Sequence, residues 1–179
     1  MKEGMLPPGQ HLAKGWPVSH YGPVPRLRPD RWNLQVLGAT ASGQTHSWTF
    51  DEVANMPKIT VHADLHCASG TSTTGHTFFG VPARTLLDLA PPAAGVSHVM
   101  AWAEYGYSAN LRLSDFIADT TVMATHHDDE ALTVEHGFPL RLVVPNATPT
   151  RRTTAPSRGQ TPGTRRPNLQ ERYLICHSF

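Results

Sequence analysis

Cysteine is scarce in this sequence, since the 179 residues contain only two, Cys67 and Cys176. Two cysteines can form at most one bridge, which excludes a disulfide framework. Cys67 stands in ordered-looking sequence and Cys176 in an atypical tail, so we expect both to be reduced thiols. A reducing compartment fits this pattern.

Long hydrophobic runs are also missing. No apolar stretch approaches the ~20 residues that a membrane span requires. Residues 1–10 lack the basic and then apolar layout of a secretory signal. These features predict a cytoplasmic protein with no membrane partner.

Net charge is small, at +1, which argues against a strongly charged partner. The charges are nevertheless unevenly placed. Residues 1–145 hold nine Lys or Arg against thirteen Asp or Glu, whereas residues 146–179 hold six Arg and one Glu. Such a split is typical of a basic tail on a near-neutral domain. Six arginines could contact nucleic acid phosphates, but no aromatic interleaving supports this, so a nucleic-acid partner is not expected.

Proline and glycine are plentiful, with 16 and 14 residues, and they predict many turns and short elements. Alternating patterns predict strands, and capping signals and leucine spacing predict short helices. Irregular alternation of the two favours a mixed, mainly-β α+β domain. The expected strands are 32–37, 59–67, 99–103, 122–125 and 140–144, and residues 68–77 are expected to form a loop. Three helical segments are expected: 49–56 with a capping box of Thr49 and Glu52, 82–89 with Leu86, Leu87 and Leu89 facing inward, and 114–117 capped by Ser114.

Chemistry-bearing residues gather after two of the expected strands. Cys67 ends one strand, and the run 126–130, His-His-Asp-Asp-Glu, follows another. A thiolate at an exposed strand end can bind a soft or high-valent metal, although a lone cysteine there is more often a small buried hydrophobe. Arg141 lies inside an apolar strand and requires either a buried anion or a solvent-facing position. Zinc-binding spacings such as Cys-x-x-Cys or His-Glu-x-x-His are absent.

Five motifs in order resemble the molybdopterin oxidoreductases of the sulfite oxidase family, and most of all its small cytoplasmic bacterial members. They are Gly-Trp-Pro-Val-Ser-His-Tyr-Gly-Pro-Val-Pro at 15–25, His-Cys at 66–67, Gly-Val-Pro-Ala-Arg-Thr-Leu-Leu at 80–87, Gly-Tyr-Ser-Ala-Asn-Leu at 106–111, and the stretch 124–145. The last is the most specific. The resemblance covers roughly residues 15–145 and implies the sulfite oxidase fold.

The resemblance also implies a molybdenum–molybdopterin cofactor and two-electron oxygen-atom transfer on a small oxyanion or sulfoxide, with an unidentified electron-transfer partner. Cys67 would be the protein ligand of molybdenum, and Tyr107 and Asn110 would lie near the metal pocket. The residues implied around the pterin and its phosphate are His20, Tyr21, His66, His126, His127, His136, Gly137 and Arg141.

Two departures from the family pattern affect this expectation. The family usually follows the metal-binding cysteine with an arginine and a tryptophan, where this chain has Gly70 and Thr71. After Pro145 the family continues with a lysine- and tryptophan-containing segment, whereas residues 146–179 are rich in Arg, Thr and Pro. We therefore expect a flexible N-terminus at 1–14, a partial cofactor domain at 15–145, and a non-family, disordered tail at 146–179, with a frameshift as its origin. The alternative function is a non-catalytic remnant that binds no cofactor.

Overall fold

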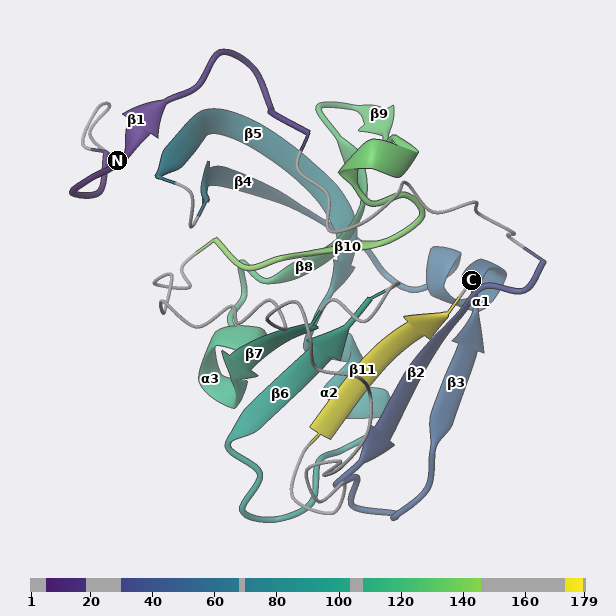
Figure 1. Cartoon of the computed structure of the whole chain (residues 1–179). Helices are drawn as coiled ribbons and strands as arrows, with labels where there is room; N and C mark the ends of the chain where they lie inside the picture. Colours follow the sequence, from purple (N-terminus) through teal and green to yellow (C-terminus); the bar gives the residue numbers. More distant parts are fainter. Residues whose placement is uncertain (1–5, 19–29, 68–69, 104–107, 146–172, 179) are drawn as a thin grey trace, which may run out of the picture.

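Two β-sheets form the framework of the chain (Figure 1). The computed structural model describes residues 6–18, 30–67, 70–103, 108–145 and 173–178. Strands dominate these residues and helices are short, which confirms the expected mixed, mainly-β class.

The first sheet has six strands and is built around the long strand β5. β4 and β8 pair with β5 antiparallel, β1 pairs with its first residues in parallel, and β9 and β10 pair with β8. Its strands are β1 (His11–Leu12), β4 (Ile59–His66), β5 (Thr71–Pro82), β8 (Val122–His127), β9 (Glu130–Ala131) and β10 (Arg141–Val143).

The second sheet has five strands in the order β3-β2-β11-β6-β7. Its strands are β2 (Asn33–Gly38), β3 (His46–Thr49), β6 (His98–Trp102), β7 (Ser108–Arg112) and β11 (Tyr173–Ser178). β11 is antiparallel to β2 and parallel to β6, so it occupies the middle of this sheet. Figure 1 shows it as the yellow arrow between these neighbours.

The three α-helices in the described part of the chain follow their sequence signals to different degrees. α1 (Phe50–Ala54) has the expected capping box, because the Thr49 side chain accepts from the Glu52 backbone and the Glu52 side chain accepts from the Thr49 backbone. α2 (Thr85–Leu89) buries Leu86, but Leu89 was expected to face inward and is 47% exposed. α3 (Leu113–Phe116) is capped by Arg112 without a side-chain bond, so the expected Ser114 cap is wrong.

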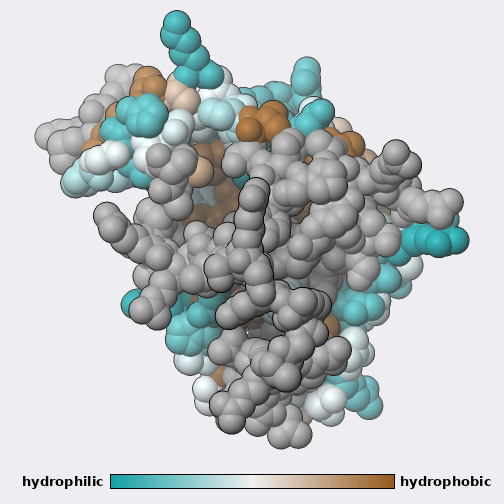
Figure 2. All heavy atoms as spheres, in the orientation of Figure 1, coloured by the Kyte–Doolittle hydropathy of each residue, from teal (hydrophilic) through white to brown (hydrophobic). Residues whose placement is uncertain are grey.

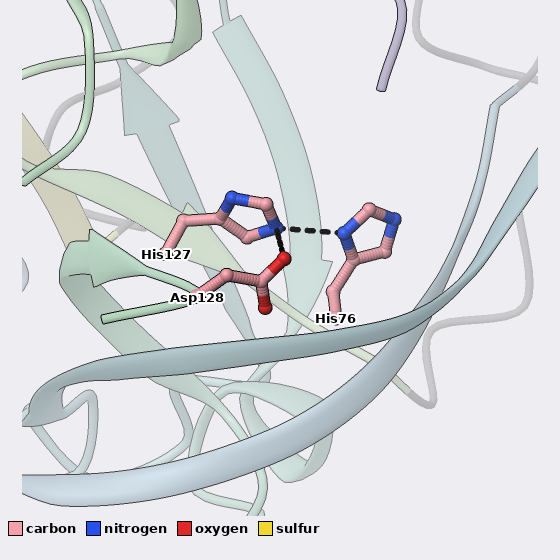
Figure 3. Close-up of side chains that lie close together, drawn as sticks. All are labelled: His76, His127 and Asp128. Carbon is pink, nitrogen blue, oxygen red and sulfur yellow. Dashed lines mark hydrogen bonds and ion pairs between the residues drawn. The ribbon is translucent and has the colours of Figure 1, made fainter. Parts of the chain in front are cut away.

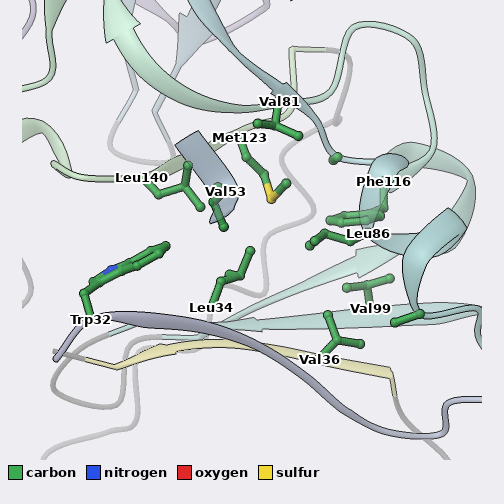
Figure 4. Packing of buried hydrophobic residues seen from close by; sticks show 12 residues of the cluster. Trp32, Leu34, Val36, Val53, Val81, Leu86, Val99, Phe116, Met123 and Leu140 are labelled. Carbon is green, nitrogen blue, oxygen red and sulfur yellow. The ribbon is translucent and has the colours of Figure 1, made fainter. Parts of the chain in front are cut away.

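Apolar side chains gather on both faces of the six-stranded sheet. One cluster fills the space between the two sheets and includes Leu34, Val36, Val81 and Met123 (Figure 4). A second cluster lies on the other face and includes Phe78, Val122 and Ala124. Strand β8 therefore packs on both sides, which explains why its first four residues are all buried.

The expected loop at 68–77 is wrong over most of its length. Residues 71–77 belong to β5, a 12-residue strand that forms a hairpin with β4. The small polar residues of this run show no apolar alternation, and their strand conformation comes from pairing with β4 and β1. Residues 68–69 lie outside the described part of the chain.

The expected disordered tail also differs from the structure at its last strand. Residues 173–178 form β11, whereas 146–172 and 179 lie outside the described residues. The same holds for 1–5 of the expected flexible N-terminus. β10 lies at the edge of the first sheet and pairs only with β8 among the described strands.

Hydrophilic residues surround the rim of the face seen in Figure 2, with small groups of hydrophobic atoms among them. The large apolar side chains that are exposed come from separate parts of the chain: Leu12, Val18, Phe79, Leu89, Trp102 and Ile117. Within the described residues, no helix has the length and apolar character needed to cross a bilayer.

Candidate functional site

The indole ring of Trp16 is the centre of the densest group of functional side chains. His136 stacks on it with ring centroids 4.2 Å apart, and the His127 ring lies at 4.3 Å. The Arg141 guanidinium carbon lies 4.9 Å from the ring centre, within the range of a cation–π contact. Trp16 also packs edge-on against Phe78, which anchors the group to the second apolar cluster.

A tight turn brings both His136 and Arg141 to Trp16. The 3₁₀ helix η2 (Val134–His136) ends at Gly137, whose φ of 99° is in the left-handed region that favours glycine. A Cβ at this position would meet the Arg141 Cβ at 3.3 Å. Arg141 Nη1 donates to the His136 carbonyl oxygen at 3.0 Å. Glycine therefore permits both the turn and the close approach of the arginine stem.

A β-bulge decides which of two adjacent histidines faces this group. Phe78 pairs with His127 and Phe79 with His126, but Gly80 pairs with Ala124, so Thr125 is the extra residue in β8. Strict alternation would place His126 on the face of Ala124. The bulge instead places His127 beside Phe78, with ring centroids 5.1 Å apart. His126 packs against Phe79 and contacts the Thr125 hydroxyl through Nδ1 at 2.9 Å.

His76 is a candidate site residue that the sequence does not indicate. It lies in β5, is only 7% exposed, and its Nδ1 is 2.7 Å from His127 Nε2. Its Nε2 contacts the Thr73 hydroxyl at 2.7 Å. The one available signal was its position two residues before Phe78, which places both side chains on one strand face.

Burial controls the protonation of this histidine pair. Desolvation lowers the pKa of His76 below its usual value, the nearby His127 lowers it further, and Asp128 acts in the opposite direction. Desolvation likewise lowers the pKa of His127, and Asp128 opposes this shift. These shifts favour the neutral form of both rings, and a hydrogen bond joins His76 Nδ1 and His127 Nε2.

We expect the metal-free protein to lose stability as the pH falls below about 6.5, the ordinary histidine value. The folded-state pKa of each histidine lies below that of the unfolded state, so the unfolded chain binds more protons. Acidification therefore stabilises the unfolded chain relative to the folded one. Urea unfolding at about pH 7.5 and about pH 5.5 measures the change. His127→Gln should make the dependence shallower, with exposed His98→Gln as the control. An equal pH dependence in wild type and His127→Gln would contradict this explanation.

Cys67 lies at the end of the β4–β5 hairpin, away from Trp16. Its backbone is held by Gln10, whose Nε2 donates to the Cys67 carbonyl oxygen at 3.1 Å, and by a donation from the Cys67 N–H to the Thr71 carbonyl oxygen at 2.8 Å. The side chain is exposed. His66 pairs with Ser72 whereas His76 pairs with Ala63, which separates the two regions by on the order of 10 Å along the strands.

The other residues implied by the resemblance are not brought to this group within the described chain. His66 Nδ1 contacts the Ser72 hydroxyl at 2.8 Å, beside Cys67. Asn110 is exposed on β7 in the second sheet. His20, Tyr21 and Tyr107 lie outside the described residues.

The site thus has two parts with different chemistry. An exposed thiol lies at a strand end. Three cationic or aromatic side chains, His127, His136 and Arg141, surround Trp16 and form the Trp16 cluster with it. A soft thiolate suits a metal, and a guanidinium suits an oxyanion such as a phosphate.

Comparison with known proteins shows which family the chain is similar to. Residues 21–153 match the family described as oxidoreductase molybdopterin binding domain, a range that extends past Pro145. The uncharacterized oxidoreductase YuiH of Bacillus subtilis is 37% identical over 146 residues, which cover 81% of this chain and 73% of YuiH. Human mitochondrial sulfite oxidase is 27% identical over 69% of this chain but only 28% of its own length.

The fold is also found among solved structures. The sulfane dehydrogenase SoxCD of Paracoccus pantotrophus superposes with a TM-score of 0.60 at 22% identity, over 70% of this chain and 36% of that one. Together with the family match, these similarities show that the chain belongs to the molybdopterin-binding oxidoreductases related to sulfite oxidase.

Proposed function

We propose that this chain binds a molybdenum–molybdopterin cofactor through Cys67 and the Trp16 cluster. The proposal rests on two features of the same chain. One is the exposed thiol at a strand end, and the other is the side chains of Arg141 and His136, which the turn at Gly137 holds together. Bound there, the cofactor would supply two-electron oxygen-atom transfer at molybdenum.

The side chains present are of the chemical types that could bind a molybdenum–molybdopterin cofactor. The Cys67 thiol is exposed, so a ligand can reach it, and a thiolate is a strong ligand for such a metal. Arg141 offers a planar donor set of the kind that binds phosphate, and Trp16 holds its guanidinium in place. His136 is fixed by contacts of its Nδ1 with the Thr133 hydroxyl and of its Nε2 with the Trp16 carbonyl oxygen.

The roles of the chain's own residues follow from these contacts. Cys67 would bind the metal, and His66, fixed by Ser72, would border that end. His127, His136, Gly137 and Arg141 would surround the phosphate end, with His126 at its margin. Tyr107, Asn110, His20 and Tyr21 keep the roles that the family pattern implies, as part of this proposal.

The substrate and partners are proposed at the level of chemical class. A small oxyanion or sulfoxide and a separate electron-transfer partner fit oxygen-atom transfer, and a cytoplasmic location fits the sequence features. Gly70 and Thr71 carry no charge where the family has a cation beside the metal ligand, which predicts weak binding of an anionic substrate. The competing function is a cofactor-free remnant, which this substitution favours.

Metal analysis of protein produced with molybdate tests the proposal. We expect stoichiometric molybdenum in the wild type and almost none in Cys67→Ser, because a hydroxyl is a far weaker soft-metal ligand than a thiolate. Arg141→Ala should lower cofactor affinity by roughly 10–100-fold, the value of a charge-assisted contact with phosphate. Exposed Arg112→Ala is the matched control. Wild-type protein that folds but contains no molybdenum would establish the remnant instead.

A further inference from the structure

His76, His127 and Asp128 converge on one point (Figure 3), and the His127 ring centroid lies 4.3 Å from that of Trp16. One potential ligand atom from each of these three side chains lies within 4.8 Å of the other two. His76 comes from β5, His127 from the end of β8, and Asp128 from the turn that follows. We propose that these three side chains form a second metal site, which binds a divalent ion of the zinc class and leaves one coordination position open.

Two of the three ligands, His76 and Asp128, are already oriented by a second contact. The Thr73 hydroxyl engages His76 Nε2 and leaves Nδ1 facing the cluster. The Thr77 backbone N–H donates to Asp128 Oδ1 at 2.9 Å, which leaves Oδ2 directed at His127. Partners of this kind fix ligand orientation in metal sites and contribute strongly to affinity.

The backbone conformation at Asp128 supports a preformed metal site. Its φ of 47° lies in the left-handed region, which is uncommon for residues other than glycine. The Asp128 N–H donates to the Thr77 carbonyl oxygen at 2.8 Å, so Thr77 binds both the backbone and the side chain of this residue. The unfavourable conformation is thereby held in place, with the carboxylate beside the two imidazoles.

One ligand-atom distance matches a tetrahedral site, and a second is somewhat short. Two ligands at zinc distances of about 2.0–2.1 Å are separated by about 3.3 Å. His127 Nε2 and Asp128 Oδ2 are 3.2 Å apart, which matches. His76 Nδ1 and His127 Nε2 are 2.7 Å apart and must open by about 0.6 Å, a shift that small side-chain rotations can supply.

The chemistry of the donors selects the kind of ion. Two imidazoles and one carboxylate suit zinc and neighbouring transition metals, whereas magnesium and calcium prefer oxygen ligands alone. Burial lowers the pKa of both imidazoles, which favours the neutral form that offers a lone pair. Arg141 opposes a cation here, and the carboxylates of Asp64 and Asp128 favour it. Three protein ligands leave the fourth position for water or a substrate atom.

Zinc titration of the chelator-treated full chain tests the site. We expect one equivalent of ZnCl₂ to bind in calorimetry, and CoCl₂ to give the intense visible absorption of a tetrahedral centre. His127→Gln and Asp128→Asn should each weaken zinc binding at least about 100-fold, because even the loss of an outer partner costs about 10–100-fold. Asparagine keeps the oxygen that accepts from Thr77, so the turn is retained.

The adjacent residues provide matched controls. His126→Gln and Asp129→Asn change the same residue types one position away and should bind zinc as the wild type does. Equal binding in His127→Gln and His126→Gln, or no binding by the wild type, would overturn the proposal.

This metal site does not depend on the proposed molybdenum cofactor, and one further variant separates the two. Cys67→Ser should retain zinc binding at His76 while losing molybdenum. Zinc binding that disappears in Cys67→Ser would assign the zinc to the thiol and refute the histidine site. A wild type that binds zinc but never molybdenum would refute the cofactor proposal alone.

Discussion

Removal of residues 173–178 should abolish cooperative unfolding of the five-stranded sheet. These residues form β11, which pairs with β2 along six residue pairs and with β6 along four. Without it, two inner strands would each lose a partner, and each buried unpaired backbone group costs about 1–3 kcal/mol. Several such losses equal the whole stability of a domain, about 5–15 kcal/mol. Thermal unfolding followed by circular dichroism measures the effect.

A point substitution makes the same test without shortening the chain. Ile175 pairs with Val36 on one side and Ala101 on the other. Ile175→Pro removes a backbone donor from a central strand and should approach the effect of the deletion. Ile175→Val keeps the donor and should change the melting temperature little. If the deletion and Ile175→Pro both unfold like the wild type, β11 contributes nothing to the fold, and the expected non-structural tail is correct.

Gly80→Ala should destabilise the chain by about 3 kcal/mol or more, at the upper end of overpacking effects. Gly80 lies where β5 and β8 change register, and a Cβ there would be 2.1 Å from the Met123 carbonyl oxygen and 2.6 Å from the Ala124 Cα. Both contacts involve backbone atoms, so no side-chain rotation can relieve them. The two strands would have to separate at the point where they support both apolar clusters.

Urea unfolding of Gly80→Ala, with Phe79→Ala as the control, measures this cost. Phe79 is the adjacent residue and is 40% exposed, so its truncation should cost clearly less than the glycine substitution. A smaller effect at Gly80 than at Phe79 would show that the strands can separate without loss. Register at the bulge would then depend on contacts other than the close backbone approach.

Local sequence signals predicted the elements whose conformation is specified by their own residues and not by distant partners. The capping box at Thr49 and Glu52 and the alternation of β4 both correspond to observed elements. By contrast, the first half of β5 consists of small polar residues, and its structure depends on partners 60 residues away in β1 and on the adjacent β4. Strand pairing over such sequence distances produces no apolar–polar alternation within the strand itself.

The candidate site was predicted to a similar extent. Motif resemblance pointed to His136, Gly137 and Arg141, and the structure brings all three together through one turn. Their role toward a cofactor stays a prediction. The sequence does not indicate His76, because the small polar residues before it predict a loop and not a strand. The choice between His126 and His127 could not be made either, because it depends on a bulge that only the paired strands define.

The position of Trp16 gives this site an optical reporter. Its indole touches two imidazoles and a guanidinium, whereas Trp32 is buried in the other apolar cluster. Indole emission is sensitive to protonation of a neighbouring imidazole and to a paramagnetic ion such as Co²⁺ nearby. Difference spectra between the wild type and Trp16→Phe would isolate this signal. Acidification, metal binding and cofactor loading could then be followed in one cuvette, without an added label.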